Sequence, residues 1–158
     1  MTPFRTILCP IDFSDCSLRA FQLASTLASF HGARLLLVHV IDVPYGKHGY
    51  GGGIFEARPS DYPQRQLEAL QHLRPQLPEV TVEFLVRDGD PVVEIMHLSH
   101  DRECDLIVMG NHGQAGLRHM LVGGVAEQIL RQAHCPVVTV RPEVAVEAPP
   151  RMAGAYAS

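Results

Sequence analysis

The sequence predicts an α/β fold, in which one open sheet of five parallel strands carries helices on both faces. Five apolar runs of strand length alternate with segments that repeat apolar residues at helical spacing, which is the β-α-β order of a parallel sheet. Most runs are apolar at consecutive positions, as is typical of strands buried on both faces. The chain has 158 residues, which favours one domain over two.

The first strand, helix and second strand follow one another near the N-terminus. Residues 4–11 and 34–41 are the two apolar runs. Between them, Ser14 can cap a helix, Asp15 suits its positive N-terminal end, and Gly32 suits its C-terminal end. These segments therefore predict one β-α-β unit.

Residues 42–63 differ in composition from the rest of the chain. They hold five glycines and three prolines. A long irregular segment of this kind is either a plain surface insertion or a lid over a binding site, and we favour the surface insertion.

A second helix, a third strand and a third helix come next. Residues 80–86 alternate apolar and polar side chains, which predicts a strand near a sheet edge. Residues 88–89 are expected in a turn, with Asp90 capping a helix that has Pro91 at its first position and ends near Asp101. The second helix is predicted by four leucines at helical spacing: Leu67, Leu70, Leu73 and Leu77.

The last two strands are predicted at residues 105–109 and 137–140. A fourth helix lies between them, with its apolar stripe over residues 125–133. We take residues 1–142 as the single domain and residues 143–158, which are rich in Ala and Pro, as a flexible C-terminal tail.

Charge and composition exclude several classes of protein. The 13 Lys and Arg residues are outnumbered by 17 Asp and Glu residues, so the chain lacks the basic surface that binds nucleic acid. The longest apolar run, residues 35–41, is far shorter than the ~20 residues of a membrane-spanning helix, so we expect no membrane segment. No signal peptide is evident and the four cysteines are scattered, which predicts reduced thiols and a cytoplasmic location.

The candidate ligand site lies at the carboxyl ends of the strands, where open parallel sheets bind their ligands. Gly110, Gly113, Gly123 and Gly124 follow the fourth strand in the pattern G-x-x-G-x9-G-G. Glycines let a backbone approach a phosphate closely, and the first amides of a helix attract anions. From spacing alone, an ordinary strand exit and a tight helix entry explain these glycines equally well. Neither the Walker pattern nor the dinucleotide pattern G-x-G-x-x-G is present.

Several ordered motifs together resemble the universal stress proteins, within the adenine-nucleotide-binding α/β superfamily. They are I-L-C-P-I-D-F-S, L-L-V-H-V-I-D, D-L-I-V-M-G-N-H-G and L-V-G-G-V-A-E-Q-I-L-R-Q-A-H-C-P-V-V-T-V, and they span residues 4–141. The resemblance implies a Rossmann-like sheet with strand order 3-2-1-4-5. It also implies ATP as the ligand and a homodimer that pairs through the fifth strand. A divalent ion is expected to arrive with the phosphates of the nucleotide, as Mg²⁺ usually does.

The resemblance also implies which residues contact the nucleotide. The adenosine-end contacts fall on Asp12, Val40, Met109 and Gly110, and the phosphate contacts fall on Gly113, Gly123, Gly124 and Val125. The chain departs from the family's ATP motif at Gly124, where the motif has Ser or Thr. The lost hydroxyl donor is expected to weaken binding about tenfold or more without abolishing it.

Three readings of function follow from the resemblance. The leading one is a cytoplasmic stress-response regulator or sensor that binds ATP as a dimer. The alternatives are a nucleotide-free dimeric interaction module and a weak ATPase, for which no catalytic residue is assigned because no general base or catalytic Lys marks the site.

Individual side chains keep alternatives of their own. Asp12 suits a turn or helix cap as well as a ligand contact. His112 is favoured as a loop residue bonded to backbone over a phosphate donor. His97, His100 and Cys104 are favoured as a half-exposed helix face over a metal site, so no metal site is assigned.

Overall fold

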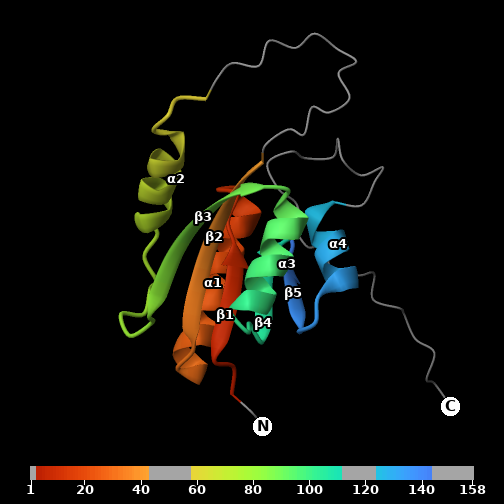
Figure 1. Ribbon diagram of the computed structural model, residues 1–158. Helices are drawn as coiled ribbons and strands as arrows, with labels where there is room; N and C mark the ends of the chain where they lie inside the picture. Colours follow the sequence, from red (N-terminus) through yellow and green to blue (C-terminus); the bar gives the residue numbers. More distant parts are fainter. Residues whose placement is uncertain (1–2, 43–57, 112–123, 144–158) are drawn as a thin grey trace, which may run out of the picture.

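In the computed structural model, strands and helices alternate along the described residues, which are 3–42, 58–111 and 124–143. The elements are β1 (Thr6–Pro10), α1 (Asp15–His31), β2 (Arg34–Asp42), α2 (Tyr62–Gln71), β3 (Val82–Gly89), α3 (Pro91–Asp101), β4 (Leu106–Gly110), α4 (Val125–Gln132) and β5 (Val137–Val140). Each predicted strand and helix is present at its predicted place in the chain (Figure 1).

The strands form one parallel sheet in the order β3-β2-β1-β4-β5. This arrangement confirms both the predicted fold class and the predicted strand order. β1 and β4 lie side by side near the middle of the sheet, and β3 and β5 are its edges. The alternating pattern of residues 80–86 is explained by this edge position, because β3 is only partly buried.

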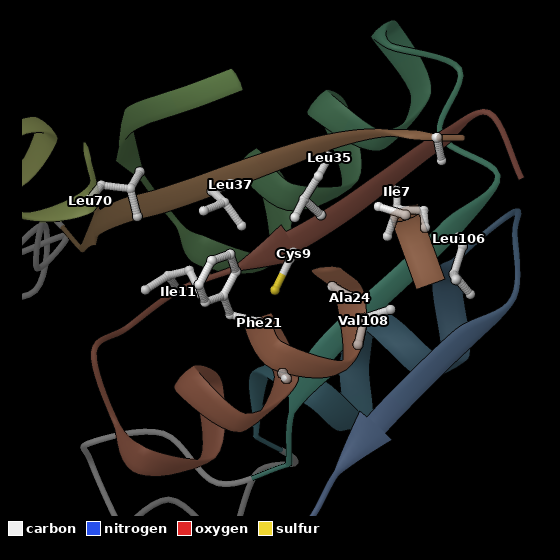
Figure 2. Packing of buried hydrophobic residues seen from close by; sticks show 13 residues of the cluster. Ile7, Cys9, Ile11, Phe21, Ala24, Leu35, Leu37, Leu70, Leu106 and Val108 are labelled. Carbon is white, nitrogen blue, oxygen red and sulfur yellow. The ribbon is translucent and has the colours of Figure 1, made fainter. Parts of the chain in front are cut away.

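The two faces of the sheet are covered by different helices (Figure 1). α1 and α2 pack on one face, whereas α3 and α4 lie against each other on the other face. Figure 2 shows the first face, where Cys9 and Leu37 of the sheet point toward Phe21 of α1. The change of face occurs where the chain passes from β3 through α3 to β4.

The central strands β1 and β4 are apolar at nearly every position, with Thr6 as the one polar residue, because both faces of each strand are buried. Successive side chains of a strand point to opposite faces. Each face of the sheet has its own cluster of buried hydrophobic residues: the α1/α2 cluster lies under α1 and α2, and the α3/α4 cluster lies under α3 and α4. In β1, Ile7 therefore belongs to the α1/α2 cluster and Leu8 to the α3/α4 cluster, and both side chains are fully buried.

Three helix ends are formed by the residues that the sequence predicts. The Ser14 hydroxyl accepts a hydrogen bond from the Ser17 N–H at 3.2 Å, and the Asp90 carboxylate accepts one from the Val93 N–H at 3.0 Å. At the C-terminal end of α1, Gly32 adopts the left-handed conformation with φ of 64°.

Two predicted boundaries are wrong. α2 ends at Gln71, so Leu73 and Leu77 lie beyond the helix. Pro75 has no N–H to donate to the Gln71 carbonyl, and in a continued helix its ring would clash with that carbonyl. β3 does not turn at residues 88–89 but continues to Gly89, because β2 is long enough to pair Asp42 with Gly89.

Other sequence predictions have mixed outcomes. Most of the 42–63 segment and of the 143–158 tail, namely residues 43–57 and 144–158, lies outside the described residues. No helix in the described ranges is long and apolar enough to cross a membrane. All four cysteines are described and are free thiols, and burial raises the pKa of Cys104 to about 12.

Candidate functional site

The candidate site lies where the carboxyl ends of β1 and β4 meet in the middle of the sheet. β1 leads into α1 on one face, and β4 leads toward α4 on the other face. The connections after two adjacent strands thus leave in opposite directions, which makes this position the topological switch point of the sheet. Ligands of open α/β sheets bind in the crevice at such a point.

Asp12 lies in the turn between β1 and α1, where its carboxylate organises the backbone. Its Oδ1 atom accepts hydrogen bonds from the Ser14 N–H at 3.0 Å and from the Ser14 hydroxyl at 2.5 Å. The Asp12 N–H donates to the Ser17 hydroxyl at 3.3 Å. The predicted turn-forming role of Asp12 is therefore observed, whereas its ligand contact stays a prediction.

Phe13 lies in the same turn, and His39 of β2 contacts it. Phe13 adopts a left-handed backbone conformation with φ of 63°, which is unfavourable for a residue with a large side chain. Its ring lies 5.0 Å, centroid to centroid, from the imidazole of His39 on β2. The His39 Nδ1 atom lies 2.7 Å from the carbonyl oxygen of Ile11.

Gly110 ends β4 where the strand comes very close to the start of α1. A Cβ atom added to Gly110 would lie 3.0 Å from the backbone carbonyl carbon of Cys16 and 3.0 Å from the backbone nitrogen of Ser17. Only a glycine fits without a shift of α1, so packing inside the domain is sufficient to explain this residue.

The first turn of α1 also holds the end of β5. The Cys16 thiol donates to the Val140 carbonyl at 2.8 Å, and the Asn111 N–H donates to the same carbonyl at 2.8 Å. The Arg19 guanidinium donates to the Arg141 carbonyl at 2.9 Å. These bonds gather the carboxyl ends of β4 and β5 around one helix terminus.

Gly124 is the N-cap residue of α4, and its surroundings differ from those of Gly110. Gly124 has no side chain to cap α4, and among the described residues a Cβ atom added to it would meet nothing within 4 Å. The backbone of Gly124, with φ of -59° and ψ of 170°, is open to any residue. The N-cap residue itself therefore offers a backbone but no hydroxyl beside the first amides of the helix and the positive end of its dipole.

The remaining predicted contact residues lie on the α3/α4 face or outside the described residues. Met109 is buried in the α3/α4 cluster. Val40 and Val125 are partly exposed and pack against the same cluster. Gly113 and Gly123, like His112, lie outside the described residues.

Sequence reasoning gave no role to Phe13 or His39. A left-handed phenylalanine has no signature in the sequence. His39 does have one, because it is a polar residue inside the apolar run 35–41.

The described residues outside the switch point give no support to a metal site. His97 and His100 are exposed on α3, whereas Cys104 is buried under it. Within residues 3–42, 58–111 and 124–143, no three His, Cys, Asp or Glu side chains are grouped so that they could hold an ion.

A family model described as the universal stress protein family matches residues 3–141. The chain belongs to this family. A universal stress protein of Methanocaldococcus jannaschii is 32% identical over 140 residues, which cover 87% of this chain and 82% of the relative. A universal stress protein of Thermus aquaticus is 32% identical over 142 residues, which cover 87% of this chain and 99% of the relative.

Solved structures of the family have the same fold. A member from Burkholderia pseudomallei matches with a TM-score of 0.62 at 26% identity, covering 89% of this chain and 98% of the other. A universal stress protein in complex with cAMP matches with a TM-score of 0.64 at 22% identity, covering 87% of this chain and 97% of the other. A member from Archaeoglobus fulgidus in complex with dAMP matches with a TM-score of 0.51 at 22% identity, covering 89% and 99%.

The two described glycines of the motif in this universal stress protein predict opposite responses to substitution. Gly110→Ala places a methyl group against the backbone of α1, which cannot yield without moving the helix. We expect the free energy of unfolding to fall by about 1–3 kcal/mol, as in overpacked cores. Urea unfolding followed by circular dichroism measures the change.

Gly124→Ser is the matched control for this experiment. Its side chain enters open space and gives α4 a capping hydroxyl, so the free energy of unfolding is expected to stay the same or to rise by a few tenths of a kcal/mol, about the usual difference between these caps. A Gly110→Ala protein as stable as the wild type would contradict the close approach of β4 and α1.

Proposed function

We propose that this universal stress protein binds an adenine nucleotide, ATP with Mg²⁺, in the crevice between the carboxyl ends of β1 and β4. As a homodimer in the cytoplasm, it acts as a regulator or sensor in a stress response. The observation that carries the proposal is the arrangement at the switch point. The Asp12 turn follows one central strand, and the chain from the other leads to the helix N-terminus at Gly124, whose N-cap residue has no side chain.

The turn after β1 and the start of α4 suit the two ends of a nucleotide. A carboxylate such as that of Asp12 accepts hydrogen bonds from hydroxyl groups of a ribose. The first amides of α4 suit phosphate oxygens, because they point out of the helix at the positive end of its dipole. Asp12, Val40, Met109 and Gly110 would contact the adenosine end, and Gly113, Gly123, Gly124 and Val125 would contact the phosphates.

Three further observations support the proposal. Two solved universal stress proteins with this fold are complexes with cAMP and dAMP, and both ligands are adenine nucleotides. The described residues offer no cluster of metal ligands, so Mg²⁺ is proposed to be held chiefly by the phosphates it accompanies. The four free thiols agree with a reducing compartment such as the cytoplasm.

A nucleotide-free interaction module is the second candidate, and one pair of observations favours it. Packing against α1 already accounts for Gly110, so this glycine is not evidence for a nucleotide. Gly124 lacks the hydroxyl that the ATP motif of the family has at its position. A weak ATPase is the third candidate, and it requires a positioned water that no assigned residue supplies.

Calorimetric titration of nucleotide-stripped protein with ATP, ADP and AMP, with and without Mg²⁺, tests the proposal. We expect ATP to bind with a dissociation constant of about micromolar magnitude, and Gly123→Val to abolish binding because its side chain would block approach to the backbone. No heat from any of the three nucleotides would refute the proposed function and favour the interaction module.

Gly124→Ser is expected to tighten ATP binding in the same titration. The hydroxyl restores one donor to a charged phosphate, which corresponds to a gain of about tenfold or more in affinity. Gly124→Ala is the matched control, because it adds the same Cβ without the hydroxyl. Equal affinities for the Ser and Ala variants would show that no phosphate lies at Gly124.

The proposed dimer uses β5, because this edge strand can add a second copy to the sheet. The carbonyls of Pro136 and Val140 accept hydrogen bonds from β4 and its extension, at 3.0 and 2.8 Å. Main-chain groups of alternate residues point to opposite sides of a strand. The main-chain N–H and C=O groups of Val137 and Thr139 therefore point away from β4, toward the open edge of the sheet.

Thr139→Pro is expected to convert the dimer to a monomer. The substitution removes an outward N–H, which a second β5 strand would need, and it spares the bonds to β4. Light scattering after gel filtration should give a mass near that of one 17.4 kDa chain, and Thr139→Val, which keeps the N–H, should give twice that mass. A dimeric Thr139→Pro protein would exclude pairing through β5.

A further inference from the structure

The turn that carries Asp12 begins at the point where the ladder between β1 and β2 ends. The Ile11 N–H donates to the Val38 carbonyl at 2.8 Å, which is the last main-chain bond that the turn receives from β2. The Ile11 carbonyl is bonded instead by a side chain, the imidazole of His39, at 2.7 Å from Nδ1. A carbonyl oxygen only accepts, so Nδ1 of His39 carries the proton and donates it.

The backbone of this turn is strained, and His39 contacts the strained residue directly. Phe13 has a φ of 63°, a conformation that persists only where the surroundings hold it. The imidazole lies 5.0 Å from the Phe13 ring, at an angle of 47° between the ring planes. One side chain of β2 therefore contacts the residues on both sides of Asp12.

We propose that His39 is a positioning residue for the ligand site: its imidazole holds the Ile11 carbonyl and the Phe13 ring, and thereby sets where the Asp12 carboxylate lies. The Asp12 and Ser14 bonds shape the turn from within, whereas His39 attaches the turn to the sheet. This inference rests on the proposed nucleotide site for its effect on binding, but not for its effect on the turn.

Two substitutions separate the hydrogen bond from the space that the imidazole fills. His39→Leu fills similar space without a donor, and His39→Asn keeps a donor, because its amide nitrogen occupies about the position of Nδ1. His72 supplies the matched control, because its Nδ1 also lies close to a main-chain carbonyl, that of Glu68, at 2.6 Å. His72 is exposed at the C-terminal end of α2, away from the switch point. Circular dichroism melting of each variant identifies any that fails to fold.

ATP affinity, measured by calorimetry, is expected to fall about tenfold in His39→Leu, because the bond that places Asp12 is lost. We expect His39→Asn to recover most of this loss and His72→Leu to bind as the wild type does. Wild-type affinity in a folded His39→Leu protein would overturn the proposal. So would an affinity in His39→Asn as low as that in His39→Leu, because the hydrogen bond would then not be the cause.

Nitrogen-15 NMR of the nucleotide-free protein tests the hold on the turn without any ligand. We expect His39 to be in the Nδ1–H tautomer, and the amide signals of Asp12 and Phe13 to move in His39→Leu and to return in His39→Asn. Unmoved signals in His39→Leu would overturn the inference whether or not ATP binds. Moved signals, together with no ATP binding by the wild type, would support the hold of His39 on the turn and refute only the proposed function.

Discussion

The arrangement of this domain depends on the close approach between the end of β4 and the first turn of α1. The backbone atoms of Cys16 and Ser17 leave room at Gly110 for a hydrogen atom but not for a side chain. α1 is attached to β1 by its own chain, and Cys16 and Arg19 bind the end of β5. One helix terminus therefore contacts the carboxyl ends of three neighbouring strands, β1, β4 and β5.

A site built at this point starts with much of its polar structure already in place. The Asp12 carboxylate accepts bonds from Ser14, and Ser17 accepts the Asp12 N–H, so a ligand would meet a turn whose shape is set in advance. Preorganisation of this kind lowers the ordering cost of binding. It also means that a ligand hydroxyl has to share Asp12 with the Ser14 bonds. The observed turn bonds of Asp12 are compatible with the proposed ligand contact, because a carboxylate has several acceptor positions.

Local patterns in the sequence were sufficient for the elements and for most of their ends. Ser14, Asp90 and Gly32 act as predicted because capping depends on the residue and its immediate neighbours. The predicted extent of the second helix was wrong at Leu73 because a single proline outweighed the leucine spacing. The end of β3 was wrong because strand length is decided by the partner strand, through the pairing of Asp42 with Gly89.

The candidate site was less accessible to sequence reasoning than the fold. The strand order came from the family resemblance, since periodicity does not say which strands are neighbours. The family resemblance implied Gly110 as a ligand contact, whereas its observed contact with α1 joins residues almost a hundred positions apart, which no local pattern predicts. The bond from His39 to Ile11 is also a tertiary contact, so only the polar residue in an apolar strand pointed to it.

A nucleotide that bridges the switch point has to contact two segments that are far apart in the sequence. NMR titration of nitrogen-15-labelled protein with ATP and Mg²⁺ measures this directly. The amide signals of Asp12 and Asn111 are predicted to shift along one saturation curve, while that of Asp105, at the opposite end of β4, stays unchanged. Shifts at only one of the two segments, or two curves with different midpoints, would contradict a single nucleotide bound between β1 and β4.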